Sequence, residues 1–321
     1  CGEPALEPLP ESAIGSYLAA RFPGNCFPTE LSALLRERTD GHPLFMTHLV
    51  DDWVEGAQLT CTAGSWQVDG SLDHLRSRLP ASLRALVEQH AARCTKEEQQ
   101  LVAAASVVGD EFAVGPLAAA LEVDPLEVER CCESLVLRDL LEPRSIGRAA
   151  SGELVSRYGF RHAVYRNVLY ERIPVGQRQQ WHRRIAWAIE RESGGRAAEA
   201  AAELALHFEQ GRDAPAALRH LVVAAQSALL RSAHREAIGY LRRGLVAASE
   251  LPDGPERDQS ELVLRVSLGV ALAATQGYAS PEVERTYTRA LELCRSRGGS
   301  SELFSTLHGL CRFYGVRADF G

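Results

Sequence analysis

The sequence predicts a mainly α-helical protein: short helices with one β-hairpin, then a winged helix, then a series of paired helices. Three observations lead to this fold class. Apolar residues recur at helical spacing along most of the 321 residues, β-like stretches are confined to two places, and helical segments follow one another after Pro174. With 45% hydrophobic and 24% charged residues, the chain has enough apolar side chains to form packed cores. We therefore expect three domains, at residues 1–80, 81–173 and 174–321.

The first domain is expected to contain short helices and a hairpin. Helices are predicted at residues 12–21, 28–38 and 43–55. Ser12 is placed to cap the first helix, and Pro43 stands where a first-turn proline begins the third. That third helix is expected to bury Leu44, Phe45, His48, Leu49 and Trp53. Short β-like runs around a glycine predict a hairpin at residues 59–68.

The second domain is expected to be a winged helix. Pro80 opens a helix that ends near Arg93, and Thr95 with Glu98 forms a capping box in front of the next helix. Further helices are predicted at residues 115–121 and 125–137, strands at 140–141 and 154–160, and a wing at 144–153. Helices followed by two strands around such a loop make up the expected order.

The third domain is expected to be an array of helical hairpins. Helices are predicted at residues 175–192, 197–209, 214–230, 233–249, 257–276, 281–297 and 300–314. Small residues recur where neighbouring helices approach closely, around Gly239 and around Ala290. The pattern is typical of an imperfect solenoid of tetratricopeptide type, although Tyr240 and Tyr287 are farther apart than one 34-residue repeat.

Composition and motifs exclude several function classes. The formal net charge of −7 argues against a general nucleic-acid binder. No apolar run approaches the roughly 20 residues of a membrane span, and the cytoplasm is the expected location. The scattered cysteines indicate neither a zinc site nor a disulfide framework. We find no G-x-S-x-G or H-E-x-x-H motif, so no catalytic residue is predicted.

The single lysine, Lys96, bears on nucleotide hydrolysis. A P-loop needs glycines whose amides surround phosphate, followed by a lysine that reaches the β and γ oxygens. No such glycines precede Lys96, so we expect no enzyme activity from this chain by itself. The first residue is Cys1 and the single methionine is Met46, which is what a segment of a longer polypeptide looks like.

Three other candidate sites have simpler explanations as solvated helix faces or structural elements. His48, Asp51 and Asp52 lie on one face of a helix, a geometry that suits a metal but is more often a solvated surface. The helix at residues 126–137 occupies the DNA-recognition position, yet its three glutamates would repel phosphate, so we expect no DNA binding. A basic cluster on one helix is also expected to be a solvated face; its members are Arg178, His182, Arg183 and Arg184.

Four segments in order resemble the signal-transduction ATPases with numerous domains, the STAND class of AAA+ relatives. They are Thr39–Phe45 with its G-x-P-L sequence, Ala104–Gly109 with Phe112, Phe160–Tyr165, and Arg178–His182. In that class a P-loop core is followed by a helical lid, a winged helix and a tetratricopeptide-like array. The resemblance covers nearly the whole chain but lacks the Walker A and Walker B segments. Bacterial members of the class include transcription activators and predicted ATPases fused to kinases or cyclases.

The resemblance implies a nucleotide-binding role for Gly41, Pro43 and His162. In that class the motif's proline packs against the adenine, and a histidine after the wing touches the β-phosphate of ADP. The exposed amides of a helix N-terminus next to His162 also favour an anion. The alternative is a structural histidine that caps the helix or packs near the wing. The cofactor implied is ATP or ADP with Mg²⁺, held only together with the missing core.

The resemblance therefore implies the regulatory part of a two-state switch. An N-terminal ATPase core in cis would share the nucleotide with this chain, and a protein partner or small-molecule inducer would act on the helical array. An input shifts such a switch only if it binds the two states with different affinity. The alternative reading is an adaptor whose helical repeats mediate protein–protein interaction without a nucleotide.

Overall fold

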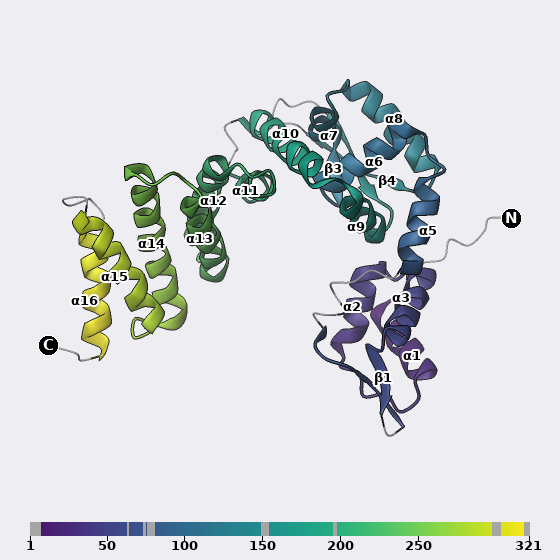
Figure 1. Cartoon of the computed structure of the whole chain (residues 1–321), viewed down its shortest axis with the longest axis horizontal. Helices are drawn as coiled ribbons and strands as arrows, with labels where there is room; N and C mark the ends of the chain where they lie inside the picture. Colours follow the sequence, from purple (N-terminus) through teal and green to yellow (C-terminus); the bar gives the residue numbers. More distant parts are fainter. Residues whose placement is uncertain are drawn as a thin grey trace. The chain divides into compact units, whose positions relative to one another are not determined.

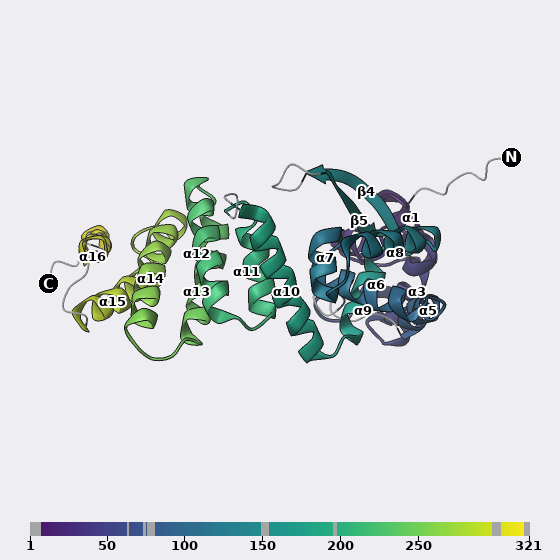
Figure 2. The same cartoon turned by 90° about the horizontal axis from the view of Figure 1, so that it is seen from above.

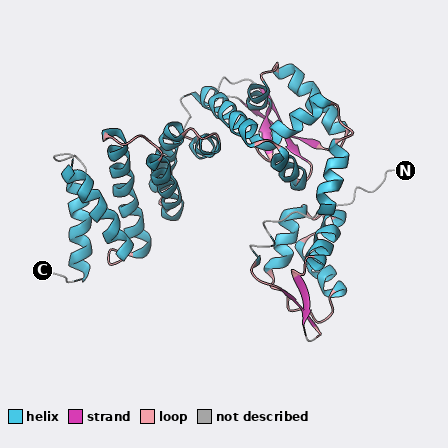
Figure 3. Ribbon diagram, in the orientation of Figure 1, coloured by secondary structure: helices cyan, strands magenta, loops and turns pink. Residues whose placement is uncertain are grey.

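The computed structural model describes residues 8–62, 64–72, 75, 81–148, 154–194, 198–296 and 303–317. It confirms the mainly α-helical fold class. Strands occur in only two places within those residues, a hairpin and a three-stranded sheet, as Figure 3 shows in magenta. The chain divides into two compact units, one ending at Pro174 and one formed chiefly by Val175–Gly321. Residues 1–80 and 81–173 both fall within the first unit, and a boundary between them stays a prediction.

The beginning of the first unit is three helices and a hairpin, shown in Figure 1 in purple and dark blue. The elements are α1 (Glu11–Arg21), α2 (Glu30–Thr39), α3 (Pro43–Glu55), β1 (Leu59–Thr62) and β2 (Ser65–Val68). The two strands pair antiparallel, with Leu59 opposite Val68, as the sequence predicted. Ile14, Leu31, Leu49 and Trp53 meet in a core that is closed to solvent.

Two details of these helices differ from the expectation. Helix α1 is preceded by Pro10 at its N-cap position, so Ser12 lies inside the first turn and caps nothing. Leu44 is 47% exposed, and His48 is only partly buried, because the apolar face of α3 is formed by Phe45, Leu49 and Trp53. Helical spacing alone did not distinguish the exposed Leu44 from the core residues of α3.

The rest of the first unit has the element order helix, strand, helix, helix, strand, strand, preceded by α5 and followed by α9. The elements are α5 (Ala81–Ala91), α6 (Lys96–Val108), β3 (Glu111–Ala113), α7 (Val114–Leu121), α8 (Pro125–Leu137), β4 (Leu141–Arg148), β5 (Leu154–Phe160) and α9 (Ala163–Arg172). The sheet order is β3-β5-β4, with β3 antiparallel to β5. Strand β3 was not expected, because three residues are too few to show alternation in the sequence. Pro80 and residues 149–153 of the expected wing lie outside the described residues.

The predicted capping box at the start of α6 is confirmed. The Thr95 hydroxyl accepts from the amide of Glu98, while the Glu98 carboxylate accepts from the amide of Thr95. The other oxygen of Glu98 accepts from Ser134 at 2.7 Å and from Arg138 at 3.1 Å, which joins α6 to the end of α8. Burial raises the pKa of Glu98, and these hydrogen bonds outweigh it, so that the net shift is downward.

The second unit is a row of helices, seen side by side in Figures 1 and 2. They are α10 (Val175–Ser193), α11 (Ala201–Gln210), α12 (Ala214–Leu230), α13 (His234–Ser249), α14 (Pro255–Gln276), α15 (Pro281–Ser296) and α16 (Leu303–Arg317). Each helix from α11 to α15 packs against its neighbours in sequence, as expected of stacked hairpins. The predicted bounds agree to within four residues where the chain is described. Among the described helices none is long and apolar enough to cross a membrane.

Close helix contacts in this array occur at other glycines than the sequence suggested. An added Cβ at Gly239 meets nothing within 4 Å, so that position is open. Gly269 on α14 and Gly309 on α16 instead face Tyr287 of α15, whose Cζ would lie 2.4 Å from a Cβ at either position. Tyr287 is 3% exposed, and both glycines are needed to make room for its ring. A helical glycine in this array therefore indicates close contact with a neighbouring helix at Gly269 and Gly309 but not at Gly239.

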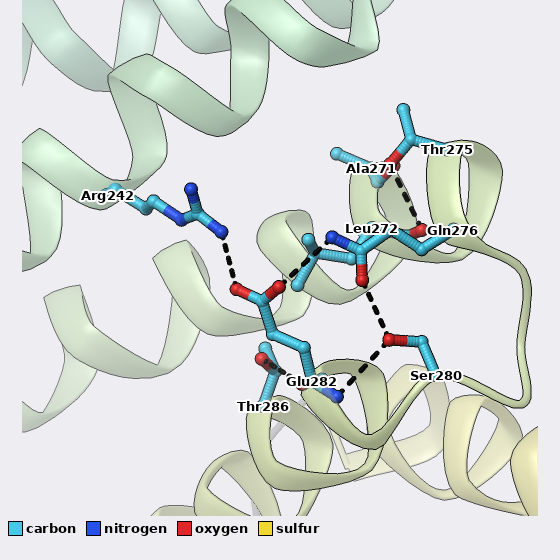
Figure 4. A network of polar contacts seen from close by, with 8 residues as sticks. All are labelled: Arg242, Ala271, Leu272, Thr275, Gln276, Ser280, Glu282 and Thr286. Atoms are coloured by element: carbon cyan, nitrogen blue, oxygen red, sulfur yellow. Dashed lines mark hydrogen bonds and ion pairs between the residues drawn. The ribbon is translucent and has the colours of Figure 1, made fainter. Parts of the chain in front are cut away.

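Polar contacts around Glu282 join three helices of the array (Figure 4). Arg242 of α13 donates to one carboxylate oxygen at 2.6 Å, and Gln276 of α14 donates to the other at 3.1 Å. Ser280 donates to Gln276 and accepts from the amide of Glu282, the second residue of α15. The hydrogen bonds from Arg242 and then Gln276 lower the pKa of Glu282. Neighbouring repeats are thus held by directional contacts as well as by apolar packing.

Candidate functional site

The predicted site residues lie on two segments that meet in the first unit. Gly41 and Pro43 belong to the turn between α2 and α3, and His162 is the residue before α9. Helix α2 packs against α9, which brings the two segments together although about 120 positions separate them. Pro43 and His162 line one cleft of about 880 Å³. Gly41 does not line it.

Gly41 is instead a backbone requirement of the turn. Its φ is +71°, and an added Cβ would lie 2.5 Å from the carbonyl oxygen of Leu9. The amide of Leu9 donates to the carbonyl of Gly41 at 2.9 Å, so the segment before α1 covers this turn directly. Glycine tolerates both the left-handed conformation and the close approach of a second backbone. The nucleotide-binding role of Gly41 stays a prediction, and its role in the turn follows from the backbone geometry.

Aromatic and imidazole rings pack together where the two segments meet. His42 stacks on Phe45 with ring centroids 4.5 Å apart, and its edge faces His162 at 4.7 Å. His162 also contacts Phe45 at 5.1 Å and lies parallel to Tyr165 at 6.1 Å. The hydroxyl of Tyr165 is 2.7 Å from Nδ1 of His90 on α5. We call these five residues the ring cluster.

The two central histidines are neutral at pH 7. Burial, followed by the effect of neighbouring His42, lowers the pKa of His162 to about 4. Burial and the charge of Arg161 lower the pKa of His42 as well. The Nδ1 atoms of His42 and His162 are both buried, and neither has a hydrogen-bond partner among the described residues. A neutral imidazole has one nitrogen that donates and one that accepts, so this site holds unused hydrogen-bonding capacity.

The cleft on one side of the ring cluster carries mixed charges. Its lining includes Pro8, Glu37, Asp40, His42, Pro43, Leu44, Asp110, Glu142, Arg144, Phe160, Arg161, His162 and Ala163. A second pocket of about 440 Å³ adjoins it and shares His42, Leu44, Arg161 and His162. Volumes of this size suit a small-molecule ligand. Both arginines already contact carboxylates, Arg161 at 3.0 Å from Asp139 and Arg144 at 2.6 Å from Glu142.

The first amide of α9 already has an acceptor within the chain. The amides at this helix N-terminus were expected to favour an anion, and the amide of Ala163 donates to Oδ2 of Asp40 at 2.8 Å. A carboxylate of the chain itself occupies this position. Sequence reasoning missed Asp40, His42 and Tyr165 as site residues. All three lie inside the segments Thr39–Phe45 and Phe160–Tyr165, and this was the available signal. The packing of α2 against α9 determines which of them face the cleft.

Two other candidate sites from the sequence were the acidic face with His48 on α3 and the basic cluster on α10. Within the described residues no group of three metal-ligating side chains forms, and Asp51 pairs with Arg21 of α1. The basic cluster on α10 is not one solvated face, because His182 is 4% exposed and its Nδ1 is 2.8 Å from Nδ1 of His207. Arg183 donates to the carbonyl of Gly211 at 2.9 Å, which ties α10 to the end of α11.

Acid should weaken the first unit through His162. The unfolded imidazole has a pKa near 6.5, whereas the folded one is lowered to about 4. The unfolded chain therefore binds this proton at higher pH, so the contribution of neutral His162 is complete above about pH 6.5 and is lost as the pH falls toward 4. His42, Asp40, Arg161 and Asp139 are the charged or titratable groups that face it.

The test compares the wild type with His162→Phe, which keeps a ring and removes the titration. Amide exchange of α9 between pH 7 and pH 4 measures the stability of this unit. We expect the variant to show a shallower loss of protection over that range. Equal pH dependence in the two proteins would contradict the assigned shift.

No family model matches the sequence. The chain is 29% identical over 145 residues to an uncharacterized protein of Rhizobium meliloti (strain 1021), a match that covers 45% of this chain and 14% of that protein. The chain thus matches a small part of a much longer relative.

One solved structure is also similar. It is the signal transduction ATPase with numerous domains (STAND) protein with a tetratricopeptide repeat sensor from Pyrococcus horikoshii. The alignment covers 97% of this chain and 58% of that one, with 13% identity and a TM-score of 0.27. A superposition at that score assigns neither fold nor function to this chain.

Proposed function

We propose that this chain is the regulatory part of a nucleotide-controlled switch. Residues 8–172 form the lid and winged-helix side of a nucleotide site whose P-loop core is another segment of the same polypeptide. The array from Val175 onward receives the input, a protein partner or a small-molecule inducer. The chain itself does no hydrolysis, since it has no P-loop lysine and no acidic Mg²⁺ ligand of the Walker B type.

One observation carries the proposal: the turn at His42 and the segment at His162 converge on one cleft, and the buried Nδ1 atoms of these two histidines have no hydrogen-bond partner in the described part of the chain. The chemical types of these residues match the groups of ADP. Pro43 and Leu44 present apolar surface for a base, while neutral imidazoles and Arg161 can donate to phosphate oxygens. The nearby carboxylates limit this fit, because Glu37, Asp110 and Glu142 also line the cleft.

Regulation would arise because the core and this chain bind the same nucleotide. ADP bound to the core and to His162 favours the state in which core, lid and winged helix stay together. An input on the array opens the switch only by binding the open state more tightly than the closed one. Moving such an equilibrium from 1:99 to 99:1 takes about 10⁴-fold selectivity, so a weakly selective input changes output only partially.

The test is ADP retention in the intact polypeptide that carries the core. His162→Ala should speed ADP release by about 10- to 100-fold, because a hydrogen bond to a charged group is worth about 1.5–3 kcal/mol. His162→Gln, which keeps an N–H donor, should lose less. Dissociation of a fluorescent ADP analogue measures the rate, and basal output should rise in parallel.

His48→Ala is the matched control, since His48 lies on α3 in the same unit but lines neither pocket. It should retain ADP like the wild type. Unchanged retention in His162→Ala, with the fold intact by circular dichroism, would eliminate the nucleotide assignment for this site.

A second candidate is a nucleotide-independent adaptor, and the array surface favours it. Several large apolar side chains there are exposed: Leu206 48%, Leu230 88%, Val246 62%, Val270 51%, Leu307 47% and Val316 60%. Exposed apolar surface of this kind is used in protein–protein contacts. The flanking gene sequence separates the two functions, because the switch requires a G-x-x-x-x-G-K-[ST] segment upstream. An adaptor would bind its partner equally with and without ADP.

A further inference from the structure

The N-terminus of α9 is capped by a residue from a distant part of the chain. The amide of Ala163 donates to the Asp40 carboxylate at 2.8 Å, across 123 positions of sequence. His162, the residue at the N-cap position, makes no side-chain capping bond of its own. In the first turn of a helix the amides have no partner within the helix. The hydrogen bond from Ala163 therefore depends on the α2–α3 turn staying against α9.

The position of the Asp40 carboxylate is set by its backbone. Asp40 ends α2 in the left-handed conformation, with φ 51° and ψ 26°, and Gly41 follows with φ +71°. The residue before it, Thr39, is buried and donates to the carbonyl of Leu35 at 2.7 Å. Asp40 and Gly41 are both in the left-handed conformation, and the buried Thr39 fixes the backbone before them. The Asp40 carboxylate therefore has little freedom to adopt another position.

The contact also determines where the ring of His162 lies. The peptide between His162 and Ala163 carries both the amide bonded to Asp40 and the Cα that bears the imidazole. Holding that peptide keeps the ring edge-on to His42 at 4.7 Å and against Phe45 at 5.1 Å. Without it, α9 loses its only capping contact among the described side chains and its first turn is free to fray.

We propose that Asp40 is the positioning residue for His162, and that its contact with Ala163 is the latch between the lid turn and the winged-helix segment. The effect on nucleotide retention rests on the function proposed above; the latch does not. Opening the cleft separates the α2–α3 turn from α9, and this breaks the contact. The Ala163 amide is therefore a direct reporter of the latched state.

Three substitutions test the latch in the chain itself. Asp40→Gly removes the carboxylate without backbone strain, because glycine adopts the left-handed conformation freely. Asp40→Asn keeps an acceptor oxygen and also tolerates that conformation. Glu122→Gly is the control, since Glu122 is another exposed acidic residue of the same unit with positive φ, at 58°. The Asp40 side chain is exposed, so its removal leaves no buried charge and the unit should fold.

The readouts are amide exchange at Ala163 and the NMR shifts of the His162 ring. Asp40→Gly should speed exchange at Ala163 by about tenfold, as for a lost helix cap, and should move the ring resonances. Asp40→Asn should stay within about threefold of the wild type because the acceptor remains. Glu122→Gly should change neither. Unchanged exchange and ring shifts in Asp40→Gly would overturn the latch.

A second measurement separates this inference from the proposed function. In the intact polypeptide, Asp40→Gly should release the fluorescent ADP analogue about tenfold faster, with Asp40→Asn restoring most of the retention. If His162→Ala loses ADP but Asp40→Gly does not, the positioning role is wrong and the nucleotide site stands. If His162→Ala retains ADP while Ala163 exchange responds to Asp40→Gly, the nucleotide site is wrong and the latch stands.

Discussion

Gly41→Ala is expected to destabilise the first unit by about 2–4 kcal/mol. An alanine in the left-handed region costs about 1 kcal/mol, and relieving a clash with fixed backbone costs about 1–3 kcal/mol more. The added Cβ would lie 2.5 Å from the carbonyl oxygen and 2.8 Å from the amide nitrogen of Leu9, neither of which is the end of a flexible side chain. The segment before α1 must therefore move away, and its bond from Leu9 to Gly41 is lost.

Gly64→Ala is the matched comparison for this effect. Gly64 has φ +83° and nothing within 4 Å of an added Cβ, so alanine there meets the backbone penalty of about 1 kcal/mol alone. Hydrogen exchange of amides in α2 and α3 measures both variants within this unit. Equal destabilisation by the two substitutions would show that Leu9 does not lie against Gly41 as described.

Gly269→Ala is expected to destabilise the second unit by about 2 kcal/mol, although alanine is the better helix former. Overpacking costs about 1–3 kcal/mol and exceeds the gain of up to about 1 kcal/mol in helix propensity. The new Cβ would lie 2.4 Å from Cζ of Tyr287, and that ring cannot shift away because Gly309 confines it equally closely from α16. We expect the contact of α14 with α15 and α16 to loosen.

Gly239→Ala should have the opposite sign. Gly239 lies inside α13 and an added Cβ meets nothing within 4 Å, so alanine should stabilise the array by about 0.5–1 kcal/mol. Thermal denaturation of the chain, with exchange of α14 and α15 amides to locate the effect, compares the two variants. Stabilisation by Gly269→Ala would mean that Tyr287 does not lie between the two glycines.

The sequence predicted most helices because the signals that determine them are local. Pro43 begins α3, Asp124 with Pro125 begins α8, and the Thr95–Glu98 box begins α6, each by bonds or steric limits within four residues. Where a local signal had a competitor, it was less reliable. Ser12 is a good capping residue, yet the helix already begins at Glu11, with Pro10 at the N-cap position.

Side-chain environment was predicted less well because it depends on packing partners that are distant in sequence. Leu44 continues the apolar pattern of α3 but faces a cleft, and His182 looked like part of a basic surface but is buried against His207. Gly239 and Gly269 are equivalent as helical glycines in the sequence, and only the position of Tyr287 makes one of them necessary.

What the sequence determined by itself was the helical class, the succession of elements, the lack of a P-loop lysine, and the two segments that carry Pro43 and His162. Only the tertiary structure decided that these segments form one site, since the packing of α2 against α9 sets which side chains meet. It also turned the expected anion position of α9 into the contact with Asp40. A helix N-terminus specifies that it needs an acceptor, but three-dimensional proximity specifies which group supplies it.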